Sequence, residues 1–433
     1  MNPEGLFSSA KAKVRSGELL AGLDAFLDLT QGRAPAAAWN DRGMVHYLLG
    51  EEELAAECFA RALAQEPRHF LARANAFYLA EAGRVKAAPV PDFRAAIRFR
   101  KSWGETPPPR VSVIMGTFNR AKLIQESIES VLKQTFCDFE LVIVNDGGDH
   151  ELETWLEAIH EPRLRYFYAE HKGTAHAYNV GIAEARGYYL AFLADDDIYY
   201  PDHLECLVAA MESLPEPAIV HADSFQAFQR KVGSGYRTVR RELRSAGPEA
   251  RERLATSNVI PPASLLFPRS FLDRVGVFRI ALRKAIDWDF NLRLADAFTF
   301  QHVAKETSEF RTRDDASQLT GKLKAEKNYW DSLVLYMNRR LNLFSFPEQP
   351  SAQSAYTRAL DLLQEMAGSA EDTIRFFSLR ELWRMTKPHR YFTDQAAKHL
   401  AAGRRELARQ MFTASLRLNP WEPKTWWGRW RAR

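Results

Sequence analysis

Three consecutive carboxylates are the part of this sequence that most clearly could do chemistry. Asp195, Asp196 and Asp197 follow an apolar run, residues 188–194, whose aromatic and aliphatic composition predicts a short buried strand. Like charges at the end of a strand repel one another and lose hydration when enclosed, so a folded protein tolerates them best around a cation. Oxygen ligands favour Mg²⁺ or Mn²⁺, ions that usually also bind substrate phosphates. The alternative for the triplet alone is a solvated acidic loop before a helix that begins near Asp202.

The segments around this triplet are predicted to be alternating strands and helices. From residue 111 onward, short β-branched runs are followed by amphipathic stretches, which indicates βα units and a mainly parallel central sheet. In open α/β sheets, ligands bind outside the carboxyl ends of the strands, where the triplet falls. The first turn, 116–120, has neither the glycine-rich fingerprint of a dinucleotide-binding domain nor a Walker loop, which disfavours both classes. The predicted strands are 111–115, 139–144, 164–168 and 188–194, and the predicted helices are 122–134 and 174–185.

Composition and charge limit the class of protein. The 433 residues are 46% hydrophobic and 26% charged, as in ordinary soluble globular proteins. The formal net charge of +4 is small for this length and argues against a nucleic-acid partner. Three widely spaced cysteines indicate a reducing compartment and neither a disulfide framework nor a zinc site. The sequence shows no signal-peptide pattern and no apolar run of roughly 18 residues, so we expect a cytoplasmic protein without a transmembrane segment.

Composition and hydrophobic periodicity divide the chain into four parts. Ala, Leu and Glu at helical spacing predict a helical region over 1–100, and three prolines make 101–110 a linker. The βα pattern spans 111–320, and a composition typical of helices returns over 321–433.

Both helical regions contain a pattern that resembles the tetratricopeptide repeat. Small residues at fixed spacing let two antiparallel helices approach closely, and a proline ends the second helix. Such repeats bind peptides in many proteins, so a protein partner is one interpretation; packing on the central domain or self-association is the other. The full unit comprises Trp39, Gly43, Tyr47, Gly50, Ala55, Phe59, Ala62 and Pro67, and its second half recurs at Gly403, Ala408, Phe412, Leu416 and Pro420.

Residues 111–204 resemble the nucleotide-binding half of inverting, family 2 glycosyltransferases of the GT-A fold. The resemblance implies an α/β fold and a nucleotide-diphosphate sugar donor that is bound together with Mg²⁺ or Mn²⁺. The sequence departs from the family's pattern at Ala194 and Asn145, where the family often has Asp. The motifs that carry the resemblance, in matching order and spacing, are VSVIMGTFNR at 111–120, NDG at 145–147, ARG at 185–187 and LADDD at 193–197.

The resemblance also implies which residues bind the donor. Phe118, with Thr117 and Asn119 in the same turn, would stack on the base, since a flat aromatic face holds a base without directional contacts. Asp146 would contact the base or the ribose, and Asp195 would lie near the ribose.

Other acidic residues carry the chemistry that the resemblance implies. Asp196 and Asp197 would hold the metal, which neutralises charge on the departing diphosphate. An inverting displacement also needs a carboxylate that takes the proton of the acceptor hydroxyl. Asp287 keeps the position of that base, although Ile286 replaces the glutamate that precedes it in the family. Asp289 is the rival base, and a helix N-cap is the alternative role for this segment.

Two arginines complete the expected site. The segment 310–317 resembles the part of such enzymes that closes over the diphosphate. Arg311 or Arg313 would bind it, since a guanidinium group matches phosphate geometry. A solvated basic loop is the alternative.

We therefore expect a metal-dependent inverting glycosyltransferase, with UDP-sugars favoured as donors and a hydroxyl of a glycan, a lipid-linked glycan or a protein as acceptor. Family habit indicates bacterial cell-surface or protein glycosylation, with membrane contact that is peripheral, at the inner face. A non-catalytic scaffold that bears repeats and a decayed transferase domain is the second hypothesis. A nucleotidyltransferase is the third, and it would be expected to show a glycine-rich basic loop after the first strand.

Overall fold

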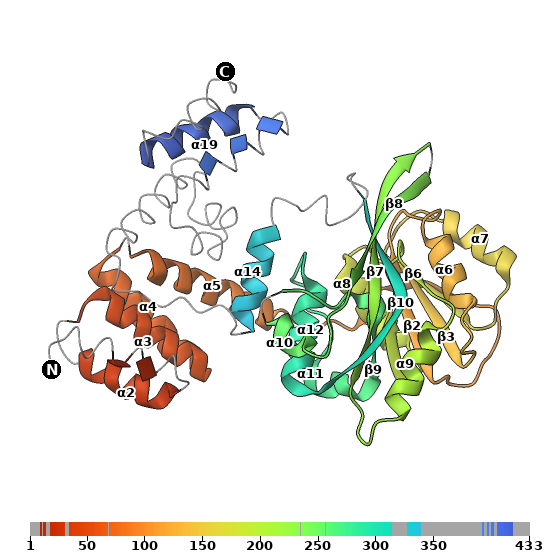
Figure 1. The fold of residues 1–433 in the computed structure, drawn as a ribbon, viewed down its shortest axis with the longest axis horizontal. Coiled ribbons are helices and arrows are strands. Elements are labelled where there is room, and N and C mark those ends of the chain that lie inside the picture. The colour runs from red at the N-terminus through yellow and green to blue at the C-terminus, as the bar shows by residue number, and fades with distance from the viewer. Residues whose placement is uncertain are drawn as a thin grey trace. The chain divides into compact units, whose positions relative to one another are not determined.

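The computed structural model describes two compact parts of the chain. One unit combines Met1–Arg84 with Ala325–Arg433, and the other, called the central unit below, is Val85–Lys324 (Figure 1). Each unit has a hydrophobic core of its own. The described residues are 18–313 apart from 31–33, 68, 234 and 256, together with 327–338, 405–418 and a few residues within 9–13 and 392–401.

The repeat predicted near the N-terminus folds as two helices, α3 (Ala36–Leu49) and α4 (Glu52–Gln65). The helices approach closely at Gly43, where a β-carbon would lie 2.6 Å from the ring of Phe59. Gly50 follows α3 with a φ of 90°, the left-handed conformation that glycine adopts without strain. The neighbouring helices are α2 (Leu19–Leu29) and α5 (Phe70–Ala87).

Helix α14 (Lys327–Met337) packs against these N-terminal helices. The ring of Tyr336 stacks on Tyr47 and on Tyr78, with centroid distances of 4.5 and 5.4 Å. Its hydroxyl donates a hydrogen bond to the carbonyl of Asn75 at 3.3 Å. The segment that follows the central unit in sequence therefore rejoins the first repeat.

The predicted half repeat near the C-terminus falls on helix α19 (Arg405–Leu418). Ala408, Phe412 and Leu416 are buried there. Gly403 and Pro420, the other two residues of the pattern, lie outside the described residues.

One mixed sheet organises the central unit (Figure 1). Its strands run in the order β1-β4-β3-β2-β5-β9-β7-β10-β6, and β8 pairs with β7. The neighbours β4, β3, β2 and β5 are mutually parallel, which confirms the predicted parallel centre and the α/β class. The first strands are β1 (Ile97–Ser102), β2 (Val111–Thr117), β3 (Phe139–Asn145), β4 (Leu164–Ala169), β5 (Tyr189–Phe192) and β6 (Ile198–Tyr199). The later ones are β7 (Ile219–Val232), β8 (Gly235–Arg244), β9 (Leu265–Pro268) and β10 (Phe300–Arg313).

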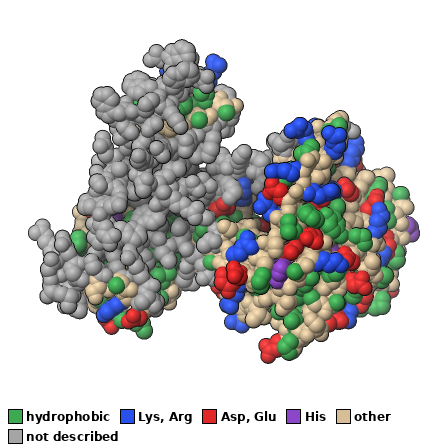
Figure 2. Space-filling model, in the orientation of Figure 1, with side chains coloured by type: hydrophobic (Ala, Val, Ile, Leu, Met, Phe, Trp, Pro, Cys, Tyr) green, Lys and Arg blue, Asp and Glu red, His purple; other side chains and the backbone are tan. Residues whose placement is uncertain are grey.

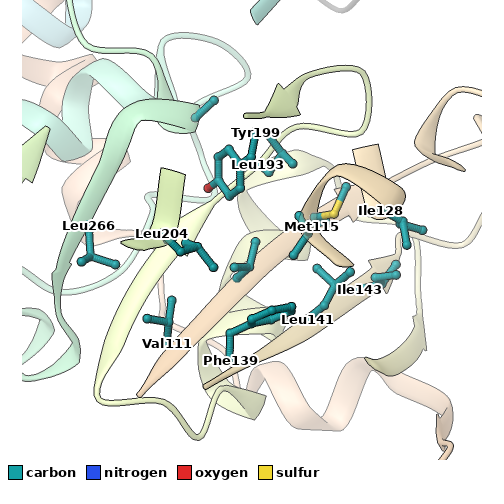
Figure 3. Packing of buried hydrophobic residues seen from close by; sticks show 14 of the residues in the cluster. Val111, Met115, Ile128, Phe139, Leu141, Ile143, Leu193, Tyr199, Leu204 and Leu266 are labelled. Carbon is teal, nitrogen blue, oxygen red and sulfur yellow. The ribbon is translucent and has the colours of Figure 1, made fainter. Parts of the chain in front are cut away.

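Helix α6 buries one side against the sheet, as its amphipathic sequence predicts, whereas α8 is buried over almost its whole length. The core beneath them joins β2 and β3 to Ile128 of α6 and Leu204 of α9, as Figure 3 shows with Leu141 and Leu266. Among the described residues, no helix combines the length and the apolar character needed to cross a bilayer. The helices are α6 (Ile124–Leu132), α7 (Glu151–Ile159), α8 (Thr174–Glu184), α9 (His203–Glu212), α10 (Ala250–Leu254), α11 (Leu272–Val275) and α12 (Ile286–Ala297).

The boundary before the sheet differs from the prediction. The helical region was expected to reach residue 100 and the linker to span 101–110, yet Ile97–Ser102 forms strand β1. This strand pairs antiparallel with β4 and so belongs to the sheet. Its sequence, IRFRKS, has apolar residues only at its first and third positions, which is typical of an edge strand with little burial.

Glu140 ties the linker to the sheet. Its carboxylate is fully buried on β3 and accepts hydrogen bonds from the hydroxyl of Ser112 at 2.6 Å and from Nε of Arg186 at 2.8 Å. Arg165 adds a further contact at 3.2 Å. Arg186 also donates to the carbonyl and the hydroxyl of Thr106 in the linker. The ARG motif at 185–187 therefore has a structural role in this chain.

Candidate active site

The acid triplet lies in the turn after β5, at the carboxyl ends of the parallel strands. All three aspartates are buried. Asp195 accepts a hydrogen bond from the hydroxyl of Thr117, at the end of β2, at 2.8 Å. Its other oxygen accepts from Arg120 at 2.7 Å. The two predicted donor-site residues Thr117 and Asp195 are thus in direct contact.

Asp196 and Asp197 meet the last residues of β10. Oδ2 of Asp196 accepts a hydrogen bond from Nη1 of Arg313 at 2.6 Å, and Nη1 of Arg120 lies 3.4 Å away. Oδ1 of Asp197 accepts from the backbone N–H of Arg311 at 2.8 Å. Strand β10 thereby brings the predicted arginine segment to the triplet from more than a hundred residues away in sequence.

The two predicted arginines have different surroundings. The side chain of Arg313 is 1% exposed and pairs with Asp196. The guanidinium group of Arg311 instead forms two hydrogen bonds, at 2.7 and 2.6 Å, with the carboxylate of Glu126 on α6. Arg313 is therefore the better placed of the two to act on charge at the triplet, and diphosphate binding by either stays a prediction.

Burial, together with the charge of Asp196, raises the pKa of two carboxyl groups of the triplet. Burial raises the pKa of Asp195 to about 6, with Asp196 adding to the rise and Arg120 opposing it. Burial also raises the pKa of Asp197 well above its usual value, and Asp196 contributes again. A bound cation would stabilise the ionised forms of both groups.

The residues of the triplet would fit a divalent cation whose remaining ligands come from the donor and from water. Among the residues that the structure describes, no group of three or more His, Cys, Asp or Glu side chains could by itself hold a metal ion. Mg²⁺, however, is usually bound through one or two carboxylates together with substrate phosphates and water. Asp196 and Asp197 match that requirement, and their role as metal ligands stays a prediction.

The predicted base-binding loop is built around Asp146. Its carboxylate is 5% exposed and lies 2.8 Å from Nδ1 of His171. The same carboxylate accepts hydrogen bonds from the backbone N–H groups of Lys172 and Gly173, at 3.0 and 2.8 Å. Asp146 therefore holds the 171–173 loop at the start of α8, and its contact with a base or ribose stays a prediction.

Phe118 lies at the surface of this loop. Its side chain is 40% exposed, and its ring stacks on His171 with a centroid distance of 4.1 Å. Asn119 adopts the left-handed conformation with a φ of 55°, and its side chain accepts a hydrogen bond from the N–H of Asp149 at 2.8 Å. His171 was not predicted as a site residue, because nothing in its sequence neighbourhood distinguishes it from a loop histidine.

The two candidate bases on α12 differ in exposure and in their partners. Asp287, in the first turn, is partly exposed and accepts a hydrogen bond from Asn258 at 2.7 Å. Asp289 is fully buried, with Arg279 at 2.5 Å and Arg293 at 3.0 Å. A carboxylate fixed between two arginines is a structural ion pair, so the environment favours Asp287 as the group that can meet a substrate.

Tyr178 connects the parts of the site and was not predicted. Its ring, on α8, packs against Phe192 of β5 and Phe278 at centroid distances of 5.4 and 5.3 Å. Burial raises the pKa of its hydroxyl, and the charges of the triplet and of Asp287 raise it further. The charges of the triplet and of Asp287, about ninety residues apart in sequence, thus both add to the raised pKa of this hydroxyl.

Comparison with known proteins identifies two segments of the chain. Residues 112–276 match the model of glycosyl transferase family 2. Residues 36–69 match the tetratricopeptide repeat, which α3 and α4 form.

Individual relatives share part of their length with this chain. A glycosyltransferase of Rickettsia felis is 26% identical over 277 residues, which are 60% of this chain and 45% of that protein. One of Rickettsia prowazekii is 26% identical over 234 residues, 52% of this chain and 72% of that protein. Among solved structures, S. aureus TarS 1-349 is 17% identical with a TM-score of 0.40, over 64% of this chain and 91% of that one. The chain therefore spans less than half the length of the Rickettsia felis relative.

Proposed function

We propose that the family 2 glycosyltransferase domain that this chain carries transfers a sugar from a nucleotide-diphosphate donor to an acceptor hydroxyl, with inversion at the anomeric carbon. The observations that carry the proposal are the buried acid triplet, held by Thr117 and Arg313 after β5, and the partly exposed Asp287 on α12. An inverting transfer needs one set of groups at the leaving diphosphate and a separate base at the acceptor. The triplet and Asp287 supply these from different elements.

The donor would bind at the carboxyl ends of β2 and β3. The exposed ring of Phe118 offers a stacking surface for the base, and His171 supports that ring from one side. Stacking tolerates different bases, so this ring by itself would not select the base. A UDP-sugar is the first donor to test.

Asp287 would act as the general base. The hydrogen bond from Asn258 orients its carboxylate, and its partial exposure lets an acceptor hydroxyl reach it. Arg313 would add positive charge near the diphosphate. Asp196 and Asp197 would hold a divalent cation, which would neutralise negative charge on the leaving group.

The acceptor would be a hydroxyl of a glycan, a lipid-linked glycan or a protein. The three cysteines are free, which supports a reducing, cytoplasmic location. A lipid-linked acceptor would then be reached from the inner face of the membrane, by peripheral contact. The helical repeat would present a protein partner or pack within its own unit.

The test is a donor screen with the purified full chain. Release of nucleotide is measured with a panel of nucleotide sugars in the presence of Mn²⁺, Mg²⁺ or a chelator. We expect turnover with one donor that is lost with the chelator, and an inverted anomeric configuration by NMR once an acceptor is found. Absence of both binding and turnover for every donor would instead favour the scaffold with a decayed domain.

A further inference from the structure

Arg313, the last residue of β10, carries a buried positive charge. Lys and Arg side chains also gather at the surface of the central unit, around the end of the β7–β8 hairpin (Figure 2). The side chain of Arg313 differs from these, because it is only 1% exposed and lies over the ring of Tyr236 on β8 at 4.5 Å. A guanidinium group that is removed from water needs a charged partner. Asp196 is such a partner, at 2.6 Å.

The two carboxylates that would hold the metal have different partners in the protein. Oδ1 of Asp197 accepts a hydrogen bond from the backbone N–H of Arg311, a group that β10 fixes in place. Oδ2 of Asp196 instead accepts from the side chain of Arg313, and Nη1 of Arg120 lies 3.4 Å from the same oxygen. A side chain can change its rotamer while the strand stays in place. Of these two carboxylates, Asp196 is therefore the one whose cationic partners can be exchanged.

A divalent cation at Asp196 would compete with Arg313 for this carboxylate. Two cations on one carboxylate repel each other, and the repulsion is strong where little water lies between them. An arginine that gives up a carboxylate keeps its charge, and a phosphate group offers it the same bidentate geometry. The diphosphate of the donor is therefore a suitable second partner for Arg313.

We propose that Arg313 is the counterion of Asp196 in the metal-free chain and exchanges this carboxylate for the donor's diphosphate when a divalent cation binds. This exchange rests on the proposed function and deepens it, because it couples the metal to the donor. Without a donor, the cation would have to break a buried ion pair and would bind weakly. Coupling between two ligands is reciprocal, so the bound cation would favour donor binding to the same extent.

A supporting role for Arg313 predicts the opposite effect on metal affinity. If Asp196 bridged the cation and the guanidinium group, Arg313 would orient a metal ligand. Removal of a residue that orients a ligand weakens metal affinity about 10- to 100-fold. Removal of a competing cation strengthens it. The sign of the change in affinity therefore distinguishes exchange from support.

The test is Mn²⁺ binding by the purified full chain without nucleotide, measured by calorimetry and by the rise in Tm. Arg313→Gln should bind Mn²⁺ about tenfold more tightly than the wild type, an ordinary size for the coupling between two ligands. Without metal this variant should unfold at a lower temperature, because the buried Asp196 loses a counterion. Mn²⁺ should raise its Tm more than that of the wild type, since the cation replaces that counterion. Arg313→Lys keeps the charge, so its Mn²⁺ affinity should stay close to that of the wild type.

A matched control removes a charge two residues away on the same strand. The side chain of Arg311 pairs with Glu126 and Glu309 and not with the triplet, so Arg311→Gln should keep the Mn²⁺ affinity within about threefold of the wild type. Asp196→Asn should abolish the response to Mn²⁺, because the cation loses this ligand.

Several results would overturn the exchange. These are weaker, unchanged or undetectable Mn²⁺ binding by Arg313→Gln, equal tightening in Arg311→Gln, and Mn²⁺ binding that survives in Asp196→Asn. An Arg313→Gln chain that folds only with Mn²⁺ would support the exchange, since the cation then supplies the missing charge. One that stays unfolded at every Mn²⁺ concentration would contradict it.

Donor turnover separates the exchange from the proposed function. A chain that turns over a donor but gains no Mn²⁺ affinity in Arg313→Gln would remain a transferase in which Arg313 does not compete with the metal. A chain that shows the gain but turns over no donor would refute the transferase assignment and keep Arg313 as the counterion of Asp196.

Discussion

Exchanging each of the two aspartates on α12 for asparagine should separate catalysis from stability. Asp287→Asn keeps the side-chain volume and can still pair with Asn258, so its free energy of unfolding should fall by about 1 kcal/mol or less. Loss of a general base should lower kcat about 10²- to 10⁴-fold.

Asp289→Asn should instead lower the free energy of unfolding strongly and leave the candidate general base in place. The buried carboxylate faces Arg279 at 2.5 Å and Arg293 at 3.0 Å, and the side chain of Arg293 is only 12% exposed. Removing the negative charge leaves two poorly hydrated guanidinium groups without a counterion. Breaking a buried ion pair in this way costs about 3–5 kcal/mol.

The assay measures both quantities for each variant. Donor turnover gives kcat, and urea unfolding of the purified chain gives the free energy of unfolding. Asp273→Asn on α11 is the control, because this exposed carboxylate should change neither. A stable Asp289→Asn variant without activity, together with an active Asp287→Asn variant, would exchange the two roles and refute the reasoning.

Three other changes test single features of the central unit. Phe118→Ala should weaken nucleotide binding by about 1–3 kcal/mol in calorimetry, the usual value of a base-stacking contact, and unchanged affinity would exclude stacking. Glu140→Gln should lower the free energy of unfolding by about 3–5 kcal/mol, because two arginines lose a buried partner; a loss below 1 kcal/mol would contradict this. Burial lowers the pKa of His203 to about 3 in the folded chain, whereas in the unfolded chain its pKa is about 6.5. As the pH falls below about 6.5, the imidazole is therefore protonated in the unfolded chain but stays neutral in the folded one. Stability present above pH 6.5 is therefore lost on acidification, and between pH 7.5 and 5 the wild type should lose about 2 kcal/mol more than His203→Gln in urea unfolding. Equal losses would show that His203 is not the group responsible.

Local patterns were enough to predict the strands that carry the site. Each of β2, β3, β4 and β5 is a short apolar run with a polar loop after it, and parallel pairing brings those loops to one edge of the sheet. The positions of Thr117, Asp146 and the triplet at that edge follow from this pattern.

Contacts between distant segments could not be predicted in the same way. Asp287 and Asp289 are two residues apart on one helix, and the sequence offers no means to tell which of them meets arginines. The partners of Asp289 come from a preceding loop and from the next helical turn, so the distinction exists only in the folded chain. The same is true of His171, which reaches Phe118 across two loops.

Strand β1 was also not predicted, because basic residues alternate with its few apolar ones and the prolines after it suggest an open linker.

The position of β1 at the edge of the sheet has a practical consequence. The family match begins at residue 112, but β4 is covered on its outer side by Ile97–Ser102. A fragment that begins at residue 112 would lack β1 and leave the backbone of β4 unpaired. Such an edge promotes aggregation, because strands of other molecules can pair with it. Expression of the central unit alone should therefore start upstream of Ile97.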